Sequence, residues 1–290
     1  METAILGGML VMTPFFTIIT ATYNAAATLP RLLESLAAQT CRDFELVIQD
    51  GASTDDTVAV AESYRHRLPS LSLASEPDTG IYDAWNRALP RVRGEWVLFL
   101  GADDALVACD TLEQCHAALC NAPATASYAG GGVDLVGHDG MVVAYVPYLP
   151  GSADERMRGA MPFPHQGLWH RRTLFSKHRF DTTLRIAADY DLVCRTWTSE
   201  NGATVLPFAV TRMQRGGISD SPQHVLRVRW ENAKVAARYF PGIWTFSLFI
   251  GLLKGCLLWT VCRIVGPRNA PGFLDTIRRW RGLPPAWTGL

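Results

Sequence analysis

The chain has 290 residues, of which 48% are hydrophobic and 19% charged, and its formal net charge is zero. This composition excludes an intrinsically disordered chain, and the length allows one large domain or two smaller ones. The charge is uneven: residues 1–226 hold 17 Lys and Arg against 25 Asp and Glu, whereas residues 227–290 hold 10 against 2. We expect the C-terminal region to face an anionic surface, and the acidic body argues against nucleic-acid binding.

The two ends and the cysteines give further expectations. Residues 1–14 are mildly apolar but lack the basic start of a secretory signal, so we interpret them as a loose leader. The seven cysteines are scattered and form no CxxC or Cys/His metal-ligand spacing. A reducing compartment is the simpler inference.

Strand and helix patterns alternate over the next hundred residues. Apolar runs of strand length alternate with apolar residues at helical spacing. This order predicts an α/β fold with a mostly parallel central sheet and helices on both faces. Strands are expected at 16–20, 44–49, 71–73 and 95–100, and helices at 29–36, 56–66, 81–89, 190–197 and 225–239.

Polar residues follow each of the four strands, in the loops 22–24, 50–56, 76–80 and 103–104. In a parallel sheet, ligands bind beyond the carboxyl ends of the strands, so these loops are expected to converge on one cleft. The adjacent Asp103 and Asp104 suit a divalent cation that also binds substrate phosphates, although an acidic pair there also suits a turn or a helix N-cap.

The phosphate-binding motifs of other nucleotide-binding proteins are absent. The chain has no GxxxxGK[ST] motif and no GxGxxG after a strand. The glycines at 130–132 lack the further glycine that such a motif requires. We expect them to form a loop.

Six ordered motifs resemble the inverting glycosyltransferases of family 2, which have a GT-A fold. The similarity runs from about Phe16 to Ser219, and within the family it is greatest to bacterial enzymes that build exopolysaccharide, colanic-acid-like or lipid-linked glycans. The motifs are TATYN at 20–24, QDGASTD at 49–55, EPDTGIYDAWN at 76–86, LGADD at 100–104, HQG at 165–167 and ADYDL at 188–192.

The resemblance implies a nucleotide-diphosphate-sugar donor, normally a UDP-sugar. Thr22 and Asn24 would lie near the nucleotide, and the carboxylate of Asp50 would accept a hydrogen bond from the base. Asp78 and Gly80 match a loop beside the ribose and diphosphate, where glycine permits close backbone approach. Asp50 and Asp78 would also serve as turn formers, and that reading stays open.

The resemblance also implies a divalent metal, Mn²⁺ or Mg²⁺. The family motif is usually written Asp-X-Asp, but here Ala102 occupies its first position. Asp103 is therefore expected near the ribose and Asp104 as the metal ligand. The cation would neutralise charge on the departing nucleotide diphosphate.

Asp189 aligns with the acidic pair that supplies the base in the family, with Ala188 in place of the usual Glu. It would remove the proton from the acceptor hydroxyl, or alternatively cap the following helix. Asp191 lies about 200° further around that helix and should face elsewhere. His165 would help to bind metal, diphosphate or acceptor, and Arg215 anionic oxygens, although either would also suit an ordinary loop.

The segment 242–266 is almost wholly apolar and aromatic but contains Lys254, which is costly inside a bilayer. It resembles a helix that lies in the membrane interface; spanning and re-entrant arrangements, and a buried core helix, remain alternatives. The expected organisation is a leader at 1–14, a glycosyltransferase domain at 15–221 and a helical, membrane-associating region at 222–290.

The predicted reaction is metal-dependent transfer of one sugar, with inversion, to a lipid-linked oligosaccharide or polysaccharide acceptor at the cytoplasmic face of the inner membrane. Two other functions remain open: a sugar-1-phosphate nucleotidyltransferase, and a non-catalytic scaffold that binds nucleotide sugars. A processive synthase is disfavoured, because the chain lacks a QxxRW motif and several membrane spans.

Overall fold

The structure, a computed structural model, describes residues 3–6, 9–137, 140–198, 203–214, 224–240, 246–266 and 269–280. Its strands are β1 Thr3–Leu6, β2 Met9–Met12, β3 Phe16–Thr22, β4 Phe44–Asp50, β5 Leu71–Ser75, β6 Trp96–Leu100, β7 Ala105–Leu106, β8 Tyr128–Val136, β9 Val142–Val146, β10 Leu168–Arg171 and β11 Ala203–Gln214. Its α-helices are α1 Leu29–Ala37, α2 Thr57–Ser63, α3 Ile81–Ala88, α4 Thr111–Leu119, α5 Ala153–Arg156, α6 Ala188–Thr196, α7 Val225–Tyr239, α8 Phe246–Val265 and α9 Ala270–Trp280.

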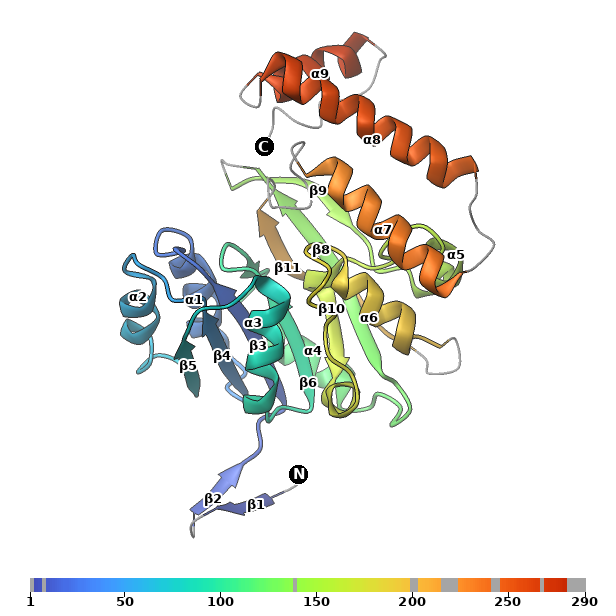
Figure 1. The fold of residues 1–290 in the computed structure, drawn as a ribbon. Helices are drawn as coiled ribbons and strands as arrows, with labels where there is room; N and C mark the ends of the chain where they lie inside the picture. The colour runs from blue at the N-terminus through green and yellow to red at the C-terminus, as the bar shows by residue number, and fades with distance from the viewer. Residues whose placement is uncertain are drawn as a thin grey trace.

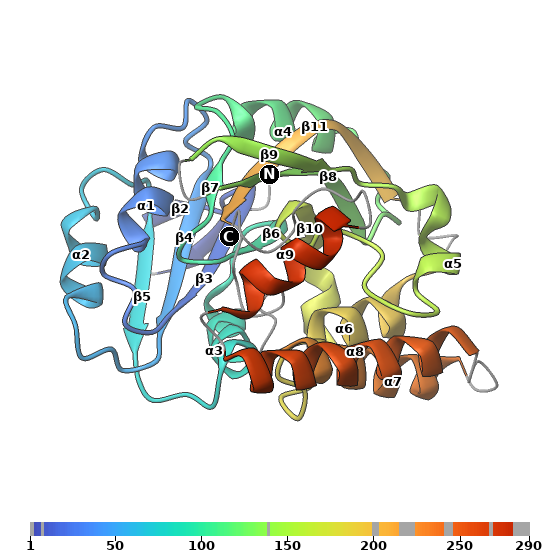
Figure 2. The same ribbon diagram turned by 90° about the horizontal axis from the view of Figure 1, so that it is seen from above.

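The central strands bury both of their faces because each carries apolar residues at successive positions. In β3, Ile18 packs into one hydrophobic core with the leucines of α1, whereas Ile19 packs into a second core with α3 and α6. In β6, Leu98 and Phe99 divide in the same way. The period of two along a strand thus places helices on both sides of the sheet, as Figures 1 and 2 show.

The main sheet has nine strands in the order β5-β4-β3-β6-β10-β8-β11-β7, and β9 pairs with β8. Strands β5, β4, β3 and β6 are parallel, as the alternating pattern predicted. The prediction of a mostly parallel sheet is only partly correct, because the second half is mixed: β11 runs parallel to β8, whereas β10 runs antiparallel to β6 and β8, β9 antiparallel to β8, and β7 antiparallel to β11. A short connection such as that between β8 and β9 can join only antiparallel strands.

The prediction that the glycines at 130–132 form a loop is also wrong, because they lie within β8. A Cβ at Gly130 would lie 2.4 Å from the ring of Tyr148, and one at Gly132 would lie 2.2 Å from the ring of Tyr145. The glycines therefore admit two tyrosine rings against the strand, a close approach that a strand glycine commonly marks.

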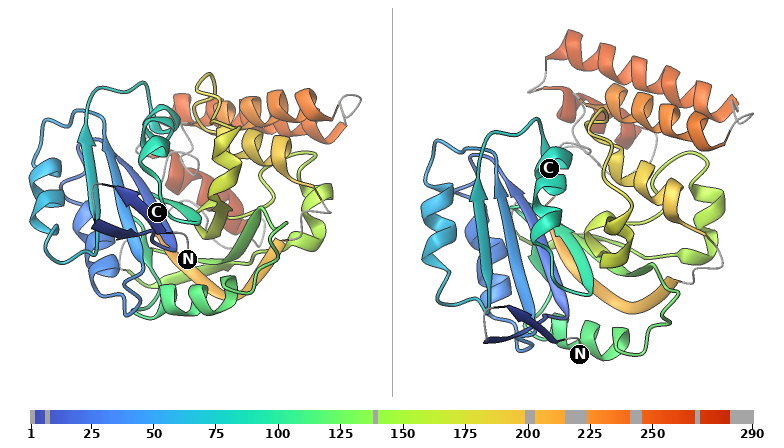
Figure 3. Two further views of the ribbon diagram at one scale, coloured as in Figure 1. Left: turned by 90° about the horizontal axis from the view of Figure 1, so that it is seen from below. Right: turned by 60° about the horizontal axis from the view of Figure 1, so that its bottom comes forward.

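The N-terminal strand pair and helices α8 and α9 lie at opposite ends of the central strands (Figure 1). Strands β1 and β2 form a hairpin below the amino ends of the strands, where we had expected a loose leader (Figures 1 and 3). Helix α7 packs on α6, and α8 lies beside α7 beyond the carboxyl edge of the sheet (Figure 1). Among the described residues, no helix combines the length and apolarity needed to cross a membrane.

Candidate active site

The loops after β3 and β4 meet at Asp50, which ends β4 and is fully buried. One carboxylate oxygen accepts hydrogen bonds from the hydroxyls of Thr22 (2.8 Å) and Ser53 (2.5 Å). The other accepts from the Ser53 N–H (2.8 Å) and the Ser75 hydroxyl (2.7 Å). Burial raises the pKa of Asp50, but these hydrogen bonds outweigh it and hold the pKa below its usual range.

Asn24 links the same two loops. It adopts a left-handed backbone conformation with φ of 48°, which Asn tolerates better than most residues. Its side-chain oxygen accepts a hydrogen bond from the N–H of Thr54 at 2.9 Å, and its own N–H donates to the Ser53 hydroxyl at 2.8 Å. The structure thus brings Thr22, Asn24 and Asp50 together, as predicted, through serine and threonine contacts that the motifs alone did not define.

Asp78 lies over the loop that begins at Gly51. A Cβ at Gly51 would lie 2.7 Å from Oδ2 of Asp78, so glycine is needed for this approach. Oδ1 of Asp78 accepts a hydrogen bond from the Gly80 N–H at 2.8 Å, and Gly80 has φ of 134°, in the region that favours glycine. Asp78 is therefore a turn former, and its side chain also reaches the loop at Gly51.

Asp103 and Asp104 follow β6 and lie against Gly101. Asp104 is 1% exposed, and its Oδ2 accepts a hydrogen bond from the Gly101 N–H at 2.7 Å. Burial raises the pKa of Asp104 to about 8, aided by the charge of Asp103, while the Gly101 N–H and Arg31 on α1 act in the opposite direction. Two neighbouring carboxylates, one of them buried, offer the oxygen ligands that a divalent cation prefers.

These two aspartates do not form a complete metal cage. Over the described part of the chain, no three His, Cys, Asp or Glu side chains gather as a metal site. A Mg²⁺ or Mn²⁺ ion commonly uses one or two carboxylates and completes its shell with water and substrate phosphates. The pair therefore fits a cation that arrives with a phosphorylated ligand.

Asp189 lies in the first turn of α6, beside Tyr82 of α3. The Tyr82 hydroxyl is 3.2 Å from Oδ1 of Asp189 and donates to the carbonyl of Ile186 at 2.5 Å. The helix N-cap is Ala187, so Asp189 lies in the first turn and not at the cap position, but its Oδ1 accepts a hydrogen bond from the Tyr190 N–H at 2.8 Å. Its carboxylate is only partly buried and is thus accessible for chemistry.

Asp191 faces the other way, as the helical geometry predicted. It is 1% exposed and accepts hydrogen bonds from Arg238 at 2.6 Å and from the Tyr239 hydroxyl at 2.9 Å, both near the end of α7. Arg195 lies 3.0 Å from its other oxygen. Asp191 thus joins α6 to α7, whereas Asp189 is directed toward α3.

His165 is buried between aromatic side chains. Its ring stacks on Trp85 and Phe99, at centroid distances of 5.3 and 5.7 Å. Burial lowers its pKa, against a weaker raising effect of Asp189, and its Nε2 has no hydrogen-bond partner within the described residues. The neutral imidazole of His165 therefore packs in this aromatic cluster as a core side chain.

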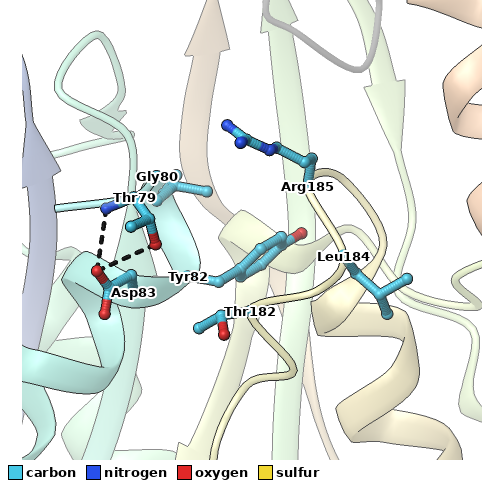
Figure 4. Close-up of a pocket in the computed structure, with 8 residues that line it drawn as sticks. Thr79, Gly80, Tyr82, Asp83, Thr182, Leu184 and Arg185 are labelled. Atoms are coloured by element: carbon cyan, nitrogen blue, oxygen red, sulfur yellow. Dashed lines mark hydrogen bonds between the residues drawn. The ribbon is translucent and has the colours of Figure 1, made fainter.

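A small hollow lies between the start of α3 and the loop that precedes α6 (Figure 4). Its lining comes from residues 79–83 and from Thr182, Leu184 and Arg185. Tyr82 connects this hollow to Asp189, whereas Asp50, Asp104 and Asp189 themselves do not line it. The structure therefore places Asp50 and Asp104 along one sheet edge but does not bring all three aspartates into this hollow.

Sequence reasoning missed two residues that line the hollow, Tyr82, which contacts Asp189, and Arg185. Tyr82 falls within the motif at 76–86, so the motif signalled its position but not its contact with Asp189. Arg185 carried no sequence signal, and its side chain extends from the loop before α6 (Figure 4). Arg215, which we had expected near anionic oxygens, lies outside the described residues.

Comparison with known proteins agrees with this arrangement. The family model described as Glycosyl transferase family 2 matches residues 17–149. The PGL/p-HBAD biosynthesis glycosyltransferase of Mycobacterium tuberculosis is 35% identical over 197 residues, which are 64% of this chain and 71% of the relative.

Two solved structures share the GT-A-like fold. Mannosyltransferase PcManGT from Pyrobaculum calidifontis, in complex with GDP-Man and Mn²⁺, has a TM-score of 0.59 at 22% identity, and the match covers 96% of this chain and 83% of that chain. TarS 1–349 from Staphylococcus aureus, in complex with UDP-GlcNAc, has a TM-score of 0.58 at 22% identity, and the match covers 84% and 72%. Against a longer TarS chain the match spans about half, 48%. The chain described here belongs to glycosyltransferase family 2.

Proposed function

We propose that the protein transfers one sugar from a nucleotide-diphosphate sugar, a UDP-sugar in the first instance, to a hydroxyl group of a lipid-linked or polysaccharide acceptor, with inversion. The observation that carries this proposal is the position of Asp189, a partly exposed carboxylate beside Tyr82 and one helix away from the loop of Asp78 and Gly80. This position supports the assignment of Asp189 as the base, because α3, which carries Tyr82, begins directly after the loop that would border the sugar diphosphate.

In the proposed reaction, the Asp189 carboxylate accepts the proton of the acceptor hydroxyl while that oxygen bonds to the anomeric carbon. The bond from this carbon to the diphosphate oxygen breaks, and its electron pair leaves with the nucleotide diphosphate. Attack from the face opposite the leaving group inverts the configuration. The Tyr82 hydroxyl donates to the Ile186 carbonyl and so helps to hold the start of α6, and with it Asp189, in place.

Thr22, Asn24, Asp50, Asp78 and Gly80 are proposed to bind the nucleotide and diphosphate. Asp50 already accepts four hydrogen bonds, and a carboxylate offers about four lone-pair sites. A base N–H can therefore bind Asp50 only if a serine hydroxyl turns away. The PcManGT and TarS complexes, which contain GDP-Man and UDP-GlcNAc, make both uridine and guanosine diphosphate sugars reasonable donors to test.

A divalent cation, Mn²⁺ or Mg²⁺, is proposed to bind at Asp104, with Asp103 toward the ribose. When bound, it would supply positive charge that stabilises the leaving diphosphate. Two observations support Asp104 as the metal ligand. Its pKa is raised, and among the described residues it has no direct hydrogen bond from a cationic side chain. Mn²⁺ in the PcManGT complex gives independent support for a metal in this fold.

Helices α8 and α9 are proposed to lie on the cytoplasmic face of the inner membrane. A lipid-linked acceptor for exopolysaccharide or envelope glycan synthesis would be held at that surface. Their exposed apolar side chains and the excess of ten Lys and Arg over two Asp and Glu in residues 227–290 support this. The exposed side chains include Leu257, Trp259, Ile264, Phe273 and Trp280.

One assay tests the activity. The chain is incubated with a panel of UDP- and GDP-sugars, Mn²⁺ and a bacterial membrane extract, and products are followed by mass spectrometry. The proposal predicts that one donor is consumed, that nucleoside diphosphate is released and that a lipid gains one sugar mass. Binding without turnover across the panel would instead favour a scaffold, and formation of a nucleotide sugar from a nucleoside triphosphate and sugar-1-phosphate would favour a nucleotidyltransferase.

A second assay tests the membrane contact. The wild-type protein should sediment with vesicles that contain anionic lipid. The partition coefficient of Leu257→Glu onto these vesicles should be about tenfold lower, because a charge replaces an exposed apolar side chain. Val142→Glu, at an exposed apolar position on β9, is the matched control and should partition as wild type. Equal partition of all three proteins would contradict the assignment of this surface.

A further inference from the structure

Glu231 lies on α7 and reaches the loop that precedes α6. Its carboxylate accepts hydrogen bonds from three consecutive backbone N–H groups: Arg185 at 3.0 and 3.1 Å, Ile186 at 2.8 Å and Ala187 at 3.1 Å. The side chain is 7% exposed. The residue at the N-cap of α6 is Ala187, which has no capping side chain, so Glu231 supplies an acceptor for this helix end from a different helix.

The peptide group between Ile186 and Ala187 is held from both sides. Its N–H donates to Glu231, and its carbonyl oxygen accepts the Tyr82 hydroxyl at 2.5 Å. Tyr82 comes from α3 and Glu231 from α7, so two helices fix one peptide that lies two residues before Asp189. The same Tyr82 hydroxyl is 3.2 Å from Oδ1 of Asp189.

A second connection between α6 and α7 does not involve the N–H groups at 185–187. Asp191 accepts hydrogen bonds from Arg238 and from the Tyr239 hydroxyl, near the C-terminal end of α7. Arg238 also donates to Asp181 in the loop before α6, whereas the Tyr239 contact lies between the two helices. The two connections lie at separate places on α7, so the docking of the helices and the fixing of the loop can be tested apart.

We propose that Glu231 is a positioning residue, which holds the loop at 185–187 so that the Asp189 carboxylate faces the acceptor hydroxyl. This inference rests on the proposed role of Asp189 as the base. A charged acceptor binds three N–H groups more strongly than a neutral one, and buried N–H groups left without an acceptor favour rearrangement of the loop. A base displaced by about 1 Å loses up to about a hundredfold in rate, whereas donor binding depends on other loops.

The test compares Glu231→Gln with Tyr239→Phe, the matched control on the same helix. Glu231→Gln removes the charge and leaves one amide oxygen to accept from the three N–H groups, with an NH2 donor in place of the other carboxylate oxygen. Tyr239→Phe removes one hydrogen bond to Asp191 and leaves the contacts at 185–187 intact. For Glu231→Gln we expect a kcat about 10- to 100-fold lower, a donor KM within twofold of wild type and faster amide hydrogen exchange in the peptide covering 181–190. Tyr239→Phe should keep kcat and the exchange rate of that peptide within twofold, even where its Tm falls.

The inference is overturned if Glu231→Gln keeps a kcat within twofold, or if kcat falls in both variants in parallel with Tm. If Glu231→Gln does not fold, Glu231→Asp retains the charge with a shorter side chain, and it should show the same split between kcat and KM; a normal kcat in that variant also overturns the inference. Asp189→Asn distinguishes failure of the role of Glu231 from failure of the proposed function. Normal turnover in Asp189→Asn removes the proposed base, whereas an inactive Asp189→Asn beside a fully active Glu231→Gln rejects only the role of Glu231.

Discussion

The hydroxyl oxygen of Tyr82 lies 3.2 Å from Oδ1 of Asp189 and 2.5 Å from the carbonyl oxygen of Ile186. Burial raises the pKa of Tyr82 well above its usual value, and the charge of Asp189 raises it further, so the phenol keeps its proton throughout the physiological range. The hydroxyl has one proton for two acceptors, and the shorter distance favours Ile186. Tyr82 therefore ties the start of α6 to α3 next to the proposed base.

Tyr82→Phe removes this donor while retaining the ring. The Ile186 carbonyl loses its partner, and we expect the free energy of unfolding to fall by about 1 to 3 kcal/mol. We also expect a lower single-turnover rate with little change in donor affinity, because the loop at Asp189 is held less firmly. Chemical denaturation and rapid-quench kinetics measure the two effects; an unchanged rate together with unchanged stability would show that the hydroxyl has no role.

Asp104→Ala should abolish the metal dependence of nucleotide binding, because this residue is the proposed protein ligand of the cation. Titration calorimetry of UDP with and without Mn²⁺ measures the effect. The wild type should bind UDP at least about tenfold more tightly with Mn²⁺, and the variant should show no such gain. Asp110→Ala, an acidic residue at the start of α4, serves as the control and should respond to Mn²⁺ as the wild type does. A full metal effect in Asp104→Ala would exclude the assigned ligand.

The raised pKa of Asp104 also predicts how stability depends on pH in the metal-free protein. The folded pKa is about 8, against the ordinary value of 3.8, so between these values the folded state holds a proton that the unfolded chain has released. Rising pH therefore removes stability, by up to about 1.4 kcal/mol per pH unit from this group. Asp104→Asn lacks the group, so its Tm relative to wild type should increase from pH 5 to pH 8 in EDTA. A constant difference in Tm would contradict the burial effect.

Gly130→Ala should destabilise the fold, because the new Cβ would lie 2.4 Å from the ring of Tyr148, which is itself buried. We expect a loss of about 1 to 3 kcal/mol in the free energy of unfolding, typical of overpacking. Gly159→Ala is the control, since a Cβ there meets no atom within 4 Å, and it should be near neutral. Urea denaturation of both variants decides this, and equal stabilities would mean that Tyr148 moves aside without cost.

The parts of the fold that the sequence predicted are those with strong local patterns. The helix at 225–239 matches α7. Strands β3 and β4 match the predicted strands to within two residues, because burial on both faces places apolar residues at successive positions of each strand. The glycines of β8 were wrongly predicted to form a loop. The two tyrosine rings that pack on them come from residues 145 and 148, and the sequence around the glycines does not show this packing. The antiparallel pairs of the sheet were missed because their strands follow no regular alternation with helices.

The candidate site likewise contains residues that the sequence predicted and residues that it did not. Residues in loops directly after strands, such as Asp50 and Asp104, were found because strand order fixes the edge at which they lie. Glu231 could not be found, because its partners are backbone N–H groups some 45 residues away and carry no side-chain signature. The saturation of Asp50 by serine and threonine hydroxyls likewise depends on loop conformations that the motifs do not specify.

The central claim is that Asp189 is the base in transfer from a nucleotide sugar. The most direct measurement is the single-turnover rate of Asp189→Asn with the donor and acceptor selected by the screen, alongside UDP affinity by calorimetry in Mn²⁺. We predict that UDP affinity stays within about threefold of wild type while the transfer rate falls by about 10²- to 10⁴-fold, the contribution of a positioned base. A transfer rate near that of the wild type, with the substitution confirmed by mass spectrometry of the purified variant, would contradict the account.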